Sequence, residues 1–441
     1  MSFPAYPSYR DSGVEWLGAV PTHWEVKPIK AVASVNDEVL AEATDAERQI
    51  EYVEISDVQA GAGIKGSTSY SFGGAPSRAR RLVRDGDIVV STVRTYLRAI
   101  AQVQNPPENM IVSTGFAVLR PKLSLSRFLG YAVQSETVIN KIIAHSTGIS
   151  YPAINANELI KISLAIPSLA EQASIAKFLD YETARIDTLI EEQQRLIKLL
   201  KEKRQAVISH AVTKGVDPTA PLKDSGVEWL GKVPEHWEVL PVRALFRFVK
   251  RQHGDDLDVL SVYREYGVIS KSSRSDNNNV TPADLSGYQT VYPGDLVVNK
   301  MKAWQGSLGV SGLHGITSPD YAVFAPTHTG VANYLHLMLR SQLLPDVYRL
   351  ISNGIRLAQW RLEPDKFKEL KVPFPPIAEQ QAISAALTQN ANQMDMLTME
   401  AEAGITLLKE RRSGLISAAV TGKIDVRGAV ETYPKPEPEP A

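Results

Sequence analysis

The chain has 441 residues, with 44% hydrophobic and 22% charged residues and a formal net charge of −1. These are ordinary values for a globular protein, and the length allows roughly two to four domains. Cysteine is absent, which excludes disulfides and thiolate metal sites. The sequence has no apolar run of membrane-spanning length and no secretory signal, so we expect a cytoplasmic protein without a membrane partner. Because the net charge is balanced, any nucleic-acid surface must be local.

One stretch occurs twice, as DSGVEWLGAVPTHWEV at residues 11–26 and as DSGVEWLGKVPEHWEV at residues 224–239. The two copies differ at two of sixteen positions and lie 213 residues apart. A match of this length indicates a tandem duplication, so we expect the chain to perform its function twice. The tryptophans and aliphatic residues of this entrance motif can form a small apolar plug. We interpret the motif as packing at the start of a domain, with exposed aromatics touching a partner as the alternative.

The region that follows the first motif looks β-rich. From Arg48, the segment RQIEYVEISDV alternates apolar and polar residues with the period of a strand. Four further apolar runs, separated by Gly, Pro and Asn, predict strands at residues 85–93, 99–104, 110–114 and 116–121. Helical spacing follows at residues 127–143, then a loop at residues 146–155 and a last strand at residues 159–167.

A long helix begins at a capping box formed by Ser168 and Glu171 and continues without Pro or Gly to Thr213. Its length, about 45 residues or roughly 65 Å, and its heptad pattern predict a coiled coil. One seam position falls at Leu179 and every seventh residue after it, and the other is placed three residues later, from Glu182. The predicted seam side chains of this helix are Leu179, Ile186, Leu189, Leu196, Leu200 and Val207.

The second copy repeats this order of elements. PGDLVVNK at residues 293–300 matches DGDIVVST at residues 85–92, and FPPIAEQ at residues 374–380 matches IPSLAEQ at residues 166–172, both 208 residues apart. The second helix repeats the heptads, with predicted seam side chains Leu387, Met394, Leu397, Leu408 and Leu415. Because the two helices share length and register, we expect them to pair antiparallel; packing of each helix on its own domain is the alternative.

These patterns predict an α+β fold, in which two β-rich domains related by a pseudo-twofold repeat are joined by two long helices forming an antiparallel coiled coil. The predicted domains are residues 1–165 and 216–373, and the predicted helices are residues 166–215 and 374–424. Residues 425–441 form a Pro/Glu-rich tail that we predict to be disordered. The ends of the two copies match closely while their middles diverge. This indicates one scaffold that carries two different recognition surfaces.

Two short motifs resemble sites of known chemistry but lack the context that they need. Residues 61–66 satisfy GxGxxG, yet the STSYSFGG that follows is not a helix whose N-terminus could hold a pyrophosphate. Asn105-Pro-Pro-Glu108 resembles the NPPY-type motif of amino-methyltransferases, but it has Glu108 where that motif stacks an aromatic ring on the base. No P-loop occurs and the eight histidines are scattered, so we expect neither a catalytic site nor a metal site.

Local groups of basic and amide side chains are the candidate nucleic-acid contacts. The stretch from Ser77 to Arg98 is rich in arginine, and its counterpart in the second copy carries lysines and amides. Two matching loops, near residues 146–150 and 352–361, add further polar residues. Such side chains reach phosphates and base edges, although a solvated surface is the competing interpretation. The candidates are Arg78, Arg81, Arg94, Arg98, Ser146, Thr147, Asn299, Lys300, Lys302, Gln305, Asn353, Arg356 and Gln359.

The combination of these features resembles the specificity subunit of type I restriction–modification systems. The resemblance is carried by GVEWLGxVPxHWEV before each variable domain, by IPSLAEQ or FPPIAEQ after it, and by long helices that end in LKEKR or LKERR. It extends to about residue 424. It implies that each variable domain is a target-recognition domain for one half of a split double-stranded DNA site, and that the helices hold the two domains apart.

The resemblance also implies partners and cofactors. The helices would dock two modification subunits, which carry S-adenosylmethionine and methylate adenine. Two restriction subunits with ATP-driven, Mg²⁺-dependent motor and nuclease activity would complete the assembly, and this chain would be non-catalytic and hold no cofactor. An adaptor protein whose paired domains bind other proteins is the alternative, and the missing motifs disfavour a stand-alone DNA-modifying enzyme. The DNA sequence that is read does not carry over by motif.

Overall fold

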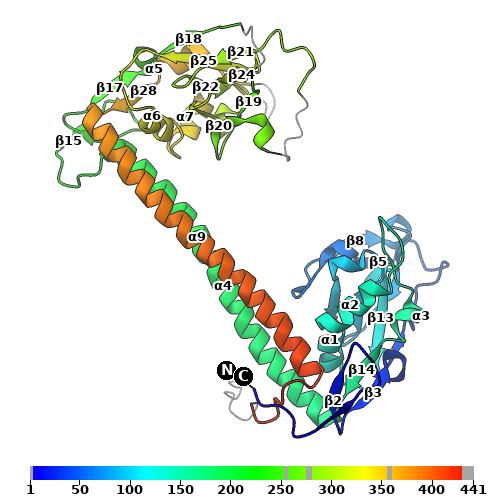
Figure 1. Cartoon of the computed structure of the whole chain (residues 1–441). Helices are drawn as coiled ribbons and strands as arrows, with labels where there is room; N and C mark the ends of the chain where they lie inside the picture. Colours follow the sequence, from blue (N-terminus) through cyan, green and yellow to red (C-terminus); the bar gives the residue numbers. More distant parts are fainter. Residues whose placement is uncertain (1–2, 253–256, 275–280, 355–359, 430–441) are drawn as a thin grey trace, which may run out of the picture. The chain divides into compact units, whose positions relative to one another are not determined.

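A computed structural model describes residues 3–252, 257–274, 281–354 and 360–429. It has two strand-rich parts and two long helices, α4 (Leu169–Lys214) and α9 (Ile377–Val420), which confirms the predicted α+β fold class (Figure 1). The chain divides into two compact units: unit 1 comprises residues 1–193 and 403–441, and unit 2 comprises residues 194–402. Among the described residues, no helix is both long enough and apolar enough to cross a membrane.

Unit 1 is built on an antiparallel sheet with two helices packed against it. The strands, in sheet order, are β11 (Ile100–Gln102), β10 (Ile88–Ser91), β13 (Phe116–Pro121) and β4 (Ala33–Val35). Helices α1 (Ser126–Gln134) and α2 (Glu136–Ala144) share a buried core with this sheet. The helical spacing predicted at residues 127–143 is confirmed, and the structure divides this region into two helices. The region is interrupted at Ser135, which has an extended backbone and whose hydroxyl donates to the carbonyl of Ala132 (2.7 Å).

Several smaller elements complete the strand-rich part of unit 1. A second sheet has the order β8 (Thr68–Ser71), β5 (Gln49–Val53), β12 (Met110–Ser113) and β9 (Ala79–Leu82). Three two-stranded pairs are β1 (Tyr9–Asp11) with β2 (Ala19–Pro21), β3 (Glu25–Pro28) with β14 (Ser163–Ile166), and β6 (Val58–Gln59) with β7 (Gly63–Ile64). The last predicted strand, residues 159–167, is shorter than expected, because helix α3 (Ala156–Leu159) occupies its start.

Unit 2 repeats the main sheet and differs in the middle. Its strands, in sheet order, are β18 (Phe246–Val249), β25 (Tyr321–Pro326), β22 (Leu296–Asn299) and β23 (Leu308–Val310). Its short helices are α5 (Val242–Leu245), α6 (Ala332–Leu339), α7 (Leu344–Leu350) and α8 (Pro364–Glu369). The two-stranded pairs are β15 (Leu222–Asp224) with β16 (Lys232–Pro234), β17 (Glu238–Pro241) with β28 (Lys371–Phe374), β19 (Leu260–Tyr263) with β20 (Gly267–Ser270), β21 (Gln289–Val291) with β24 (Gly315–Thr317), and β26 (Ser352–Asn353) with β27 (Arg361–Leu362).

In unit 1, the entrance motif packs on the first turn of the long helix. The hydroxyl of Ser168 caps that turn by accepting from the backbone N–H of Glu171 (3.3 Å). The Glu171 carboxylate does not complete the capping box; it accepts the indole N–H of Trp24 (3.1 Å) and lies 3.0 Å from Nε2 of His23. Trp24 and Glu171 are buried, so this is a buried carboxylate with donors, at a helix N-terminus that favours negative charge.

Unit 2 contains the same arrangement, made by the equivalent residues. The Glu379 carboxylate accepts the indole N–H of Trp237 (3.0 Å) and lies 2.7 Å from Nε2 of His236. The glutamine that follows also recurs: Gln172 accepts from the backbone N–H of Leu125, and Gln380 accepts from that of Val331, each just before a short helix. The repeated motif is therefore a packing motif, as we interpreted it from the sequence.

The long helices run antiparallel in each unit, as predicted. In unit 1, Leu179 of α4 shares a buried core with Ile416 near the end of α9. In unit 2, Val212 near the end of α4 shares a core with Leu387 near the start of α9. Figure 1 shows the two helices side by side.

The first predicted seam position is confirmed and the second is wrong by one residue. Most residues at the first position are buried and the rest are half-buried: Leu179, Ile186, Leu200, Leu387 and Met394 are buried, and Val207, Leu408 and Leu415 are half-buried. At the second position Leu189, Leu196 and Leu397 are exposed, whereas the residues one step later, Ile190, Ile197 and Thr398, are half-buried. The heptad alternates steps of three and four residues, and either order fits a seven-residue repeat.

One ion pair between the helices occurs in both units, and its arginine stands at this shifted seam position. In unit 2, Arg204 donates to both carboxylate oxygens of Asp395 (2.6 and 3.0 Å). In unit 1, Nε of Arg412 lies 3.2 Å from Oδ1 of Asp187, at positions 208 residues apart from the first pair. Such a pair fixes the relative register of two helices through its geometry more than through net stability.

The structure places the first residues of the predicted disordered tail in the core of unit 1. Val426 is fully buried, and the backbone N–H of Asp425 donates to the carbonyl of Pro4 (2.7 Å). The Arg427 guanidinium pairs with Asp425 and lies over the ring of Tyr6. Residues 430–441, which hold most of the Pro/Glu-rich sequence, lie outside the described residues.

The corrected seam makes a matched prediction in unit 2. Leu200 is 8% exposed and Leu196, which we had also placed in the seam, is 41% exposed. We expect Leu200→Asp to lower the free energy of unfolding by about 2–4 kcal/mol, because it buries a charge between apolar side chains. Leu196→Asp should change it by less than ~1 kcal/mol. Urea unfolding, followed by far-ultraviolet circular dichroism, measures both free energies. Equal losses of unfolding free energy in the two variants would contradict the register.

Candidate nucleic-acid interface

In unit 1, the candidate loops at residues 92–98 and 146–154 meet at one end of the main sheet. Strand β10 runs directly into the first loop, and Val93 forms a β-bridge with Ala153 of the second. The backbone N–H of Arg94 donates to the carbonyl of Pro152 (2.8 Å), and that of Ile154 donates to Thr92 (2.9 Å). These contacts hold residues that are about 60 positions apart in the chain at one surface.

The two arginines of the first loop have different environments. Arg94 and Arg98 both adopt the left-handed conformation, with φ of 51° and 55°, and they bracket a single 3-10 turn. Arg94 is exposed, has no carboxylate partner among the described residues, and its guanidinium lies 4.7 Å from the ring centre of Tyr151. Arg98 is half-buried and ion-paired with Glu136, which itself accepts from Ser413 of α9 (2.9 Å). Arg94 is therefore the better candidate for a phosphate contact, because the Arg98 guanidinium is already held in an ion pair with Glu136.

The polar residues of the second loop are mostly structural. Thr147 is exposed, and its backbone exchanges two hydrogen bonds with Ala153 (both 2.9 Å). The Ser146 hydroxyl donates to the carbonyl of Ile142 and accepts from Thr95, both at 2.8 Å. Ser146 thus ties the two loops together, and Thr147 is the side chain that is available to a ligand.

Arg78 and Arg81 lie on the neighbouring sheet of unit 1. Arg78 is exposed just before β9, and its carbonyl accepts from the backbone N–H of Thr114 (2.8 Å). Arg81 lies within β9 and is half-buried, and its Nε has no hydrogen-bond partner within the described part of the chain. Burial lowers the pKa of the Arg81 guanidinium from its ordinary value. A ligand phosphate or carbonyl could use this unsatisfied donor.

Unit 2 builds the same loop pair from different side chains. Asn299 is buried, and its amide oxygen accepts from the backbone N–H groups of Met301 (3.1 Å) and Lys302 (3.2 Å), so it shapes the loop. Lys300 is half-buried and donates to the carbonyl of Pro319 (3.0 Å). Burial, followed by repulsion from Arg361, lowers the pKa of Lys300.

The remaining candidates of unit 2 lie on or beside the hairpin β26–β27. Lys302 and Asn353 are exposed and Gln305 is half-buried. The hairpin joins the first loop through the backbone N–H of Leu362, which donates to the carbonyl of Lys300 (2.8 Å). Arg356 and Gln359 lie outside the described residues.

Aromatic side chains are the part of this surface that the candidate set omitted. In unit 2, the rings of Trp304 and Trp360 lie 5.2 Å apart, and Arg349 lies 4.5 Å from the Trp360 ring centre. In unit 1, Tyr96 and Tyr151 are both exposed. Basic residues interleaved with aromatic rings are a common signal of nucleic-acid binding, and our selection by charge and amide groups passed over the rings.

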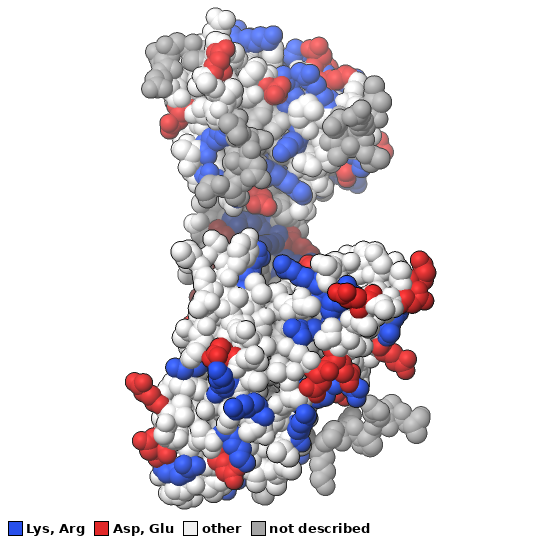
Figure 2. All heavy atoms as spheres, turned by 90° about the vertical axis from the view of Figure 1, so that its right-hand side faces the viewer, with Lys and Arg blue, Asp and Glu red and all other residues white. Residues whose placement is uncertain are grey.

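Charge on the wider surface is mixed. On the face drawn in Figure 2, Lys and Arg alternate with Asp and Glu over both units, in agreement with the net charge of −1. Binding of a polyanion to such a protein depends on a few unpaired cations, of which Arg94 is one.

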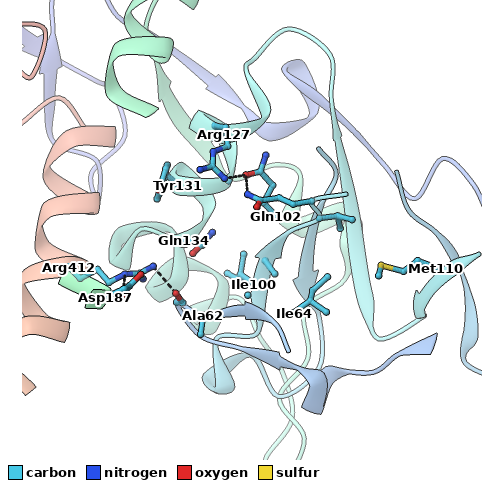
Figure 3. A pocket seen from close by; sticks show the side chains of 16 residues that line it. Ala62, Ile64, Ile100, Gln102, Met110, Arg127, Tyr131, Gln134, Asp187 and Arg412 are labelled. Carbon is cyan, nitrogen blue, oxygen red and sulfur yellow. Dashed lines mark hydrogen bonds and ion pairs between the residues drawn. The ribbon is translucent and has the colours of Figure 1, made fainter. Parts of the chain in front are cut away.

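A cavity of about 550 Å³ separates the strand-rich part of unit 1 from its helices (Figure 3). Its wall includes Arg412, which pairs with Asp187 and donates to the carbonyl of Gly61 in the β6–β7 turn (2.7 Å). On the other wall, Arg127 donates to the amide oxygen of Gln102 (3.3 Å). These contacts join the strand-rich part of unit 1 to its long helices, which indicates a structural junction. No group of three or more His, Asp or Glu in the described residues could hold a metal ion.

Comparison with known proteins matches this architecture. The profile of the type I restriction modification DNA specificity domain matches residues 21–199. The chain is 22% identical over 426 residues to the putative type I restriction enzyme MjaX specificity subunit of Methanocaldococcus jannaschii, covering 93% of this chain and 96% of that protein.

Two solved structures resemble the whole chain. One comes from a study of complex assembly and conformational transition of the type I R-M system, with a TM-score of 0.66, 21% identity, and coverage of 91% of this chain and 98% of that chain. The other is the HsdS subunit from Thermoanaerobacter tengcongensis, with a TM-score of 0.51, 21% identity, and coverage of 92% and 98%. These likenesses establish the fold.

The contrast between exposed arginines gives a prediction for polyanion binding. Arg94 has no acidic partner in the described chain, whereas Arg84 is exposed and ion-paired with Glu38. We expect Arg94→Ala to weaken binding of a random-sequence duplex and to reduce the slope of log K against log salt by nearly one, at ~0.9 per phosphate contact. Arg84→Ala should leave the slope unchanged. Fluorescence anisotropy over a salt series measures both, and an unchanged slope for Arg94→Ala would remove this loop from the interface.

Proposed function

We propose, since the chain belongs to the family of type I restriction–modification specificity subunits, that each unit reads one half of a bipartite double-stranded DNA site. The observation that carries the proposal is the pair of matching loops in each unit. Both pairs lie at the end of the equivalent sheet strand, β10 or β22, and each unit also has the same Trp–His–Glu contact at the start of its long helix. Their exposed side chains differ, with Arg94 and Tyr151 in unit 1 and Lys302 and Asn353 in unit 2. One frame with two different surfaces suits two different half-sites.

The long helices also carry exposed apolar side chains at repeated positions, which supports a docking role. Leu189 and Leu199 of α4 are exposed, and so are Leu397 and Leu407 of α9, 208 residues later in each case. Exposed leucines on a paired helix cost hydration free energy unless a partner covers them. We assign these positions to two modification methyltransferase subunits, with two restriction and translocation subunits held indirectly, and the helices to the spacing between half-sites.

In this proposal the chain itself is non-catalytic. Its share of the function is recognition and spacing, while S-adenosylmethionine, ATP and Mg²⁺ would be used by the partner subunits. Some of its charged groups at the loops and at the cavity are engaged in structural pairs, such as Arg98 with Glu136 and Arg412 with Asp187. These pairs support a framework role for the groups involved.

A domain exchange tests the proposal. Replacing residues 26–160 by the same region of a related chain keeps the Trp24–Glu171 contact, because both residues lie outside the exchanged segment. We expect one half of the methylated motif to change and the other half and the spacer to persist, since each surface acts alone. Methylation sequencing of cells that express the exchanged chain with its modification subunit measures the motif.

An exchange in the other unit serves as the control. The same exchange in unit 2, between Glu238 and Leu370, should change the other half of the motif. A change of both halves by either exchange would contradict the assignment of one half-site to each unit.

A further inference from the structure

The second candidate loop of unit 1 has exposed apolar side chains at its turn, residues 148–151, which we call the tip. Ile149 is fully exposed (103%), and Tyr151 beside it is 61% exposed. Tyr96 and Leu97 of the adjoining loop are also exposed. Single exposed apolar residues are common on protein surfaces, but four of them on two joined loops are a local concentration that water does not favour.

The tip is held in place by its base. Thr147 and Ala153 exchange two backbone hydrogen bonds at 2.9 Å, and Ala153 is bridged to Val93 of the first loop. Gly148 has a φ of 112°, and a Cβ there would lie 3.1 Å from the carbonyl oxygen of Tyr151. The turn therefore requires glycine before Ile149, and the backbone that presents Ile149 is preorganised.

We propose that Ile149 is a wedge that inserts between two stacked base pairs of the half-site bound by unit 1. The inference rests on the proposed function and adds the way in which the DNA is read. Proteins that kink a duplex insert branched or aromatic apolar side chains into a base step, and the larger protein surface that the bent duplex then covers offsets the lost stacking. Arg94, stacked on Tyr151 next to the tip, is positioned to contact a phosphate that flanks the opened step.

The tandem duplication keeps this element while its surroundings change. The first copy reads Ser146-Thr-Gly-Ile-Ser-Tyr and the second reads Ser352-Asn-Gly-Ile-Arg-Leu, so Gly-Ile is common to both. The residues that flank it differ, as base-reading residues should. A wedge depends on the deformability of a base step, so one wedge can serve two different half-sites. The second Ile lies outside the described residues, and the proposal concerns Ile149.

The shape and charge of the tip favour DNA over a protein partner. A stable protein interface covers about 800 Å² on each side, whereas this feature is one narrow turn. The cation beside it, Arg94, has no acidic partner among the described residues, and the acid that lies close by, Glu136, is engaged by Arg98 and Ser413. A narrow apolar point flanked by an unpaired cation suits a base stack between phosphates.

The test uses the purified full chain without modification subunits, so that a base flipped by a methyltransferase does not contribute. The probe is a duplex that carries the methylated motif of the producing cells, with 2-aminopurine placed at each position of the two half-sites in turn. We expect the wild-type chain to raise the fluorescence at one step of one half-site, because unstacking relieves quenching. Ile149→Ser should abolish this rise and weaken binding by about three- to tenfold while leaving the salt slope unchanged.

Two further variants control the result. Ile149→Leu should keep the fluorescence rise, and Leu123→Ser, which removes a side chain that is 70% exposed elsewhere on unit 1, should change neither fluorescence nor affinity. A rise that persists in Ile149→Ser, or wild-type binding without any rise, would overturn the wedge. Normal DNA binding by Ile149→Ser with lost capture of the modification subunit would show a protein-docking tip instead. Wild-type protein that does not bind the duplex would overturn the proposed function itself.

Discussion

A carboxylate on the first turn of each long helix, buried in unit 1 and half-buried in unit 2, joins the strand-rich part of its unit to the helix. Glu171 and Glu379 each accept an indole N–H and contact a histidine of the entrance motif. A carboxylate that is largely removed from water needs such donors, and a helix N-terminus adds favourable electrostatics. The geometry fixes where each strand-rich part begins relative to where its helix begins. This explains why the entrance motif and the start of each helix are nearly identical in the two copies, while the residues between them are free to differ.

The same division between frame and surface runs through both units. The frame consists of the main sheet, the helix seam and the repeated Arg–Asp pairs, Arg204 with Asp395 and Arg412 with Asp187. The surface consists of loops whose backbones are pinned to the sheet and whose side chains are replaceable. Separation of this kind lets recognition change without loss of stability, because surface substitutions away from caps and cores cost little.

Much of the fold was predictable from the duplication and the periodicity. Repeated motifs predicted two copies of one set of elements, and the first seam position was correct at Leu179, Leu200 and Leu387. The second position failed because leucine and isoleucine occur side by side at residues 189–190 and 196–197, and a heptad count alone does not choose between them. The break at Ser135 was missed because helical spacing continues across it. The predicted start of the disordered tail, residue 425, was too early, because composition alone does not reveal that a single valine, Val426, is buried.

The candidate interface remains a prediction, and the structure describes the surroundings of its residues, which the sequence did not reveal. The sequence match identified corresponding loops in the two copies, and the structure adds that the two loops within a copy meet, through the Val93–Ala153 bridge and the Leu362–Lys300 hydrogen bond. Residue type did not distinguish an exposed arginine from one engaged with Glu136, or an exposed amide from one that caps its own loop, as Asn299 does. Such differences depend on tertiary partners, which a single sequence does not reveal. The aromatic rings were missed for the same reason, because their exposure is set by the fold.

The central claim is that the paired helices set the spacing between two independent readers. Its most direct test inserts one heptad into both helices, after Gln193 and after Ala401, which preserves the seam. Each helix gains ~10 Å, so the spacer of the methylated motif should lengthen by about three base pairs. Methylation of a plasmid library with randomised spacer lengths allows for the accompanying rotation of roughly 100° around the duplex. We expect a longer spacer for the double insertion and lost methylation for a single insertion. Full methylation at the original spacing by the double insertion would contradict the claim.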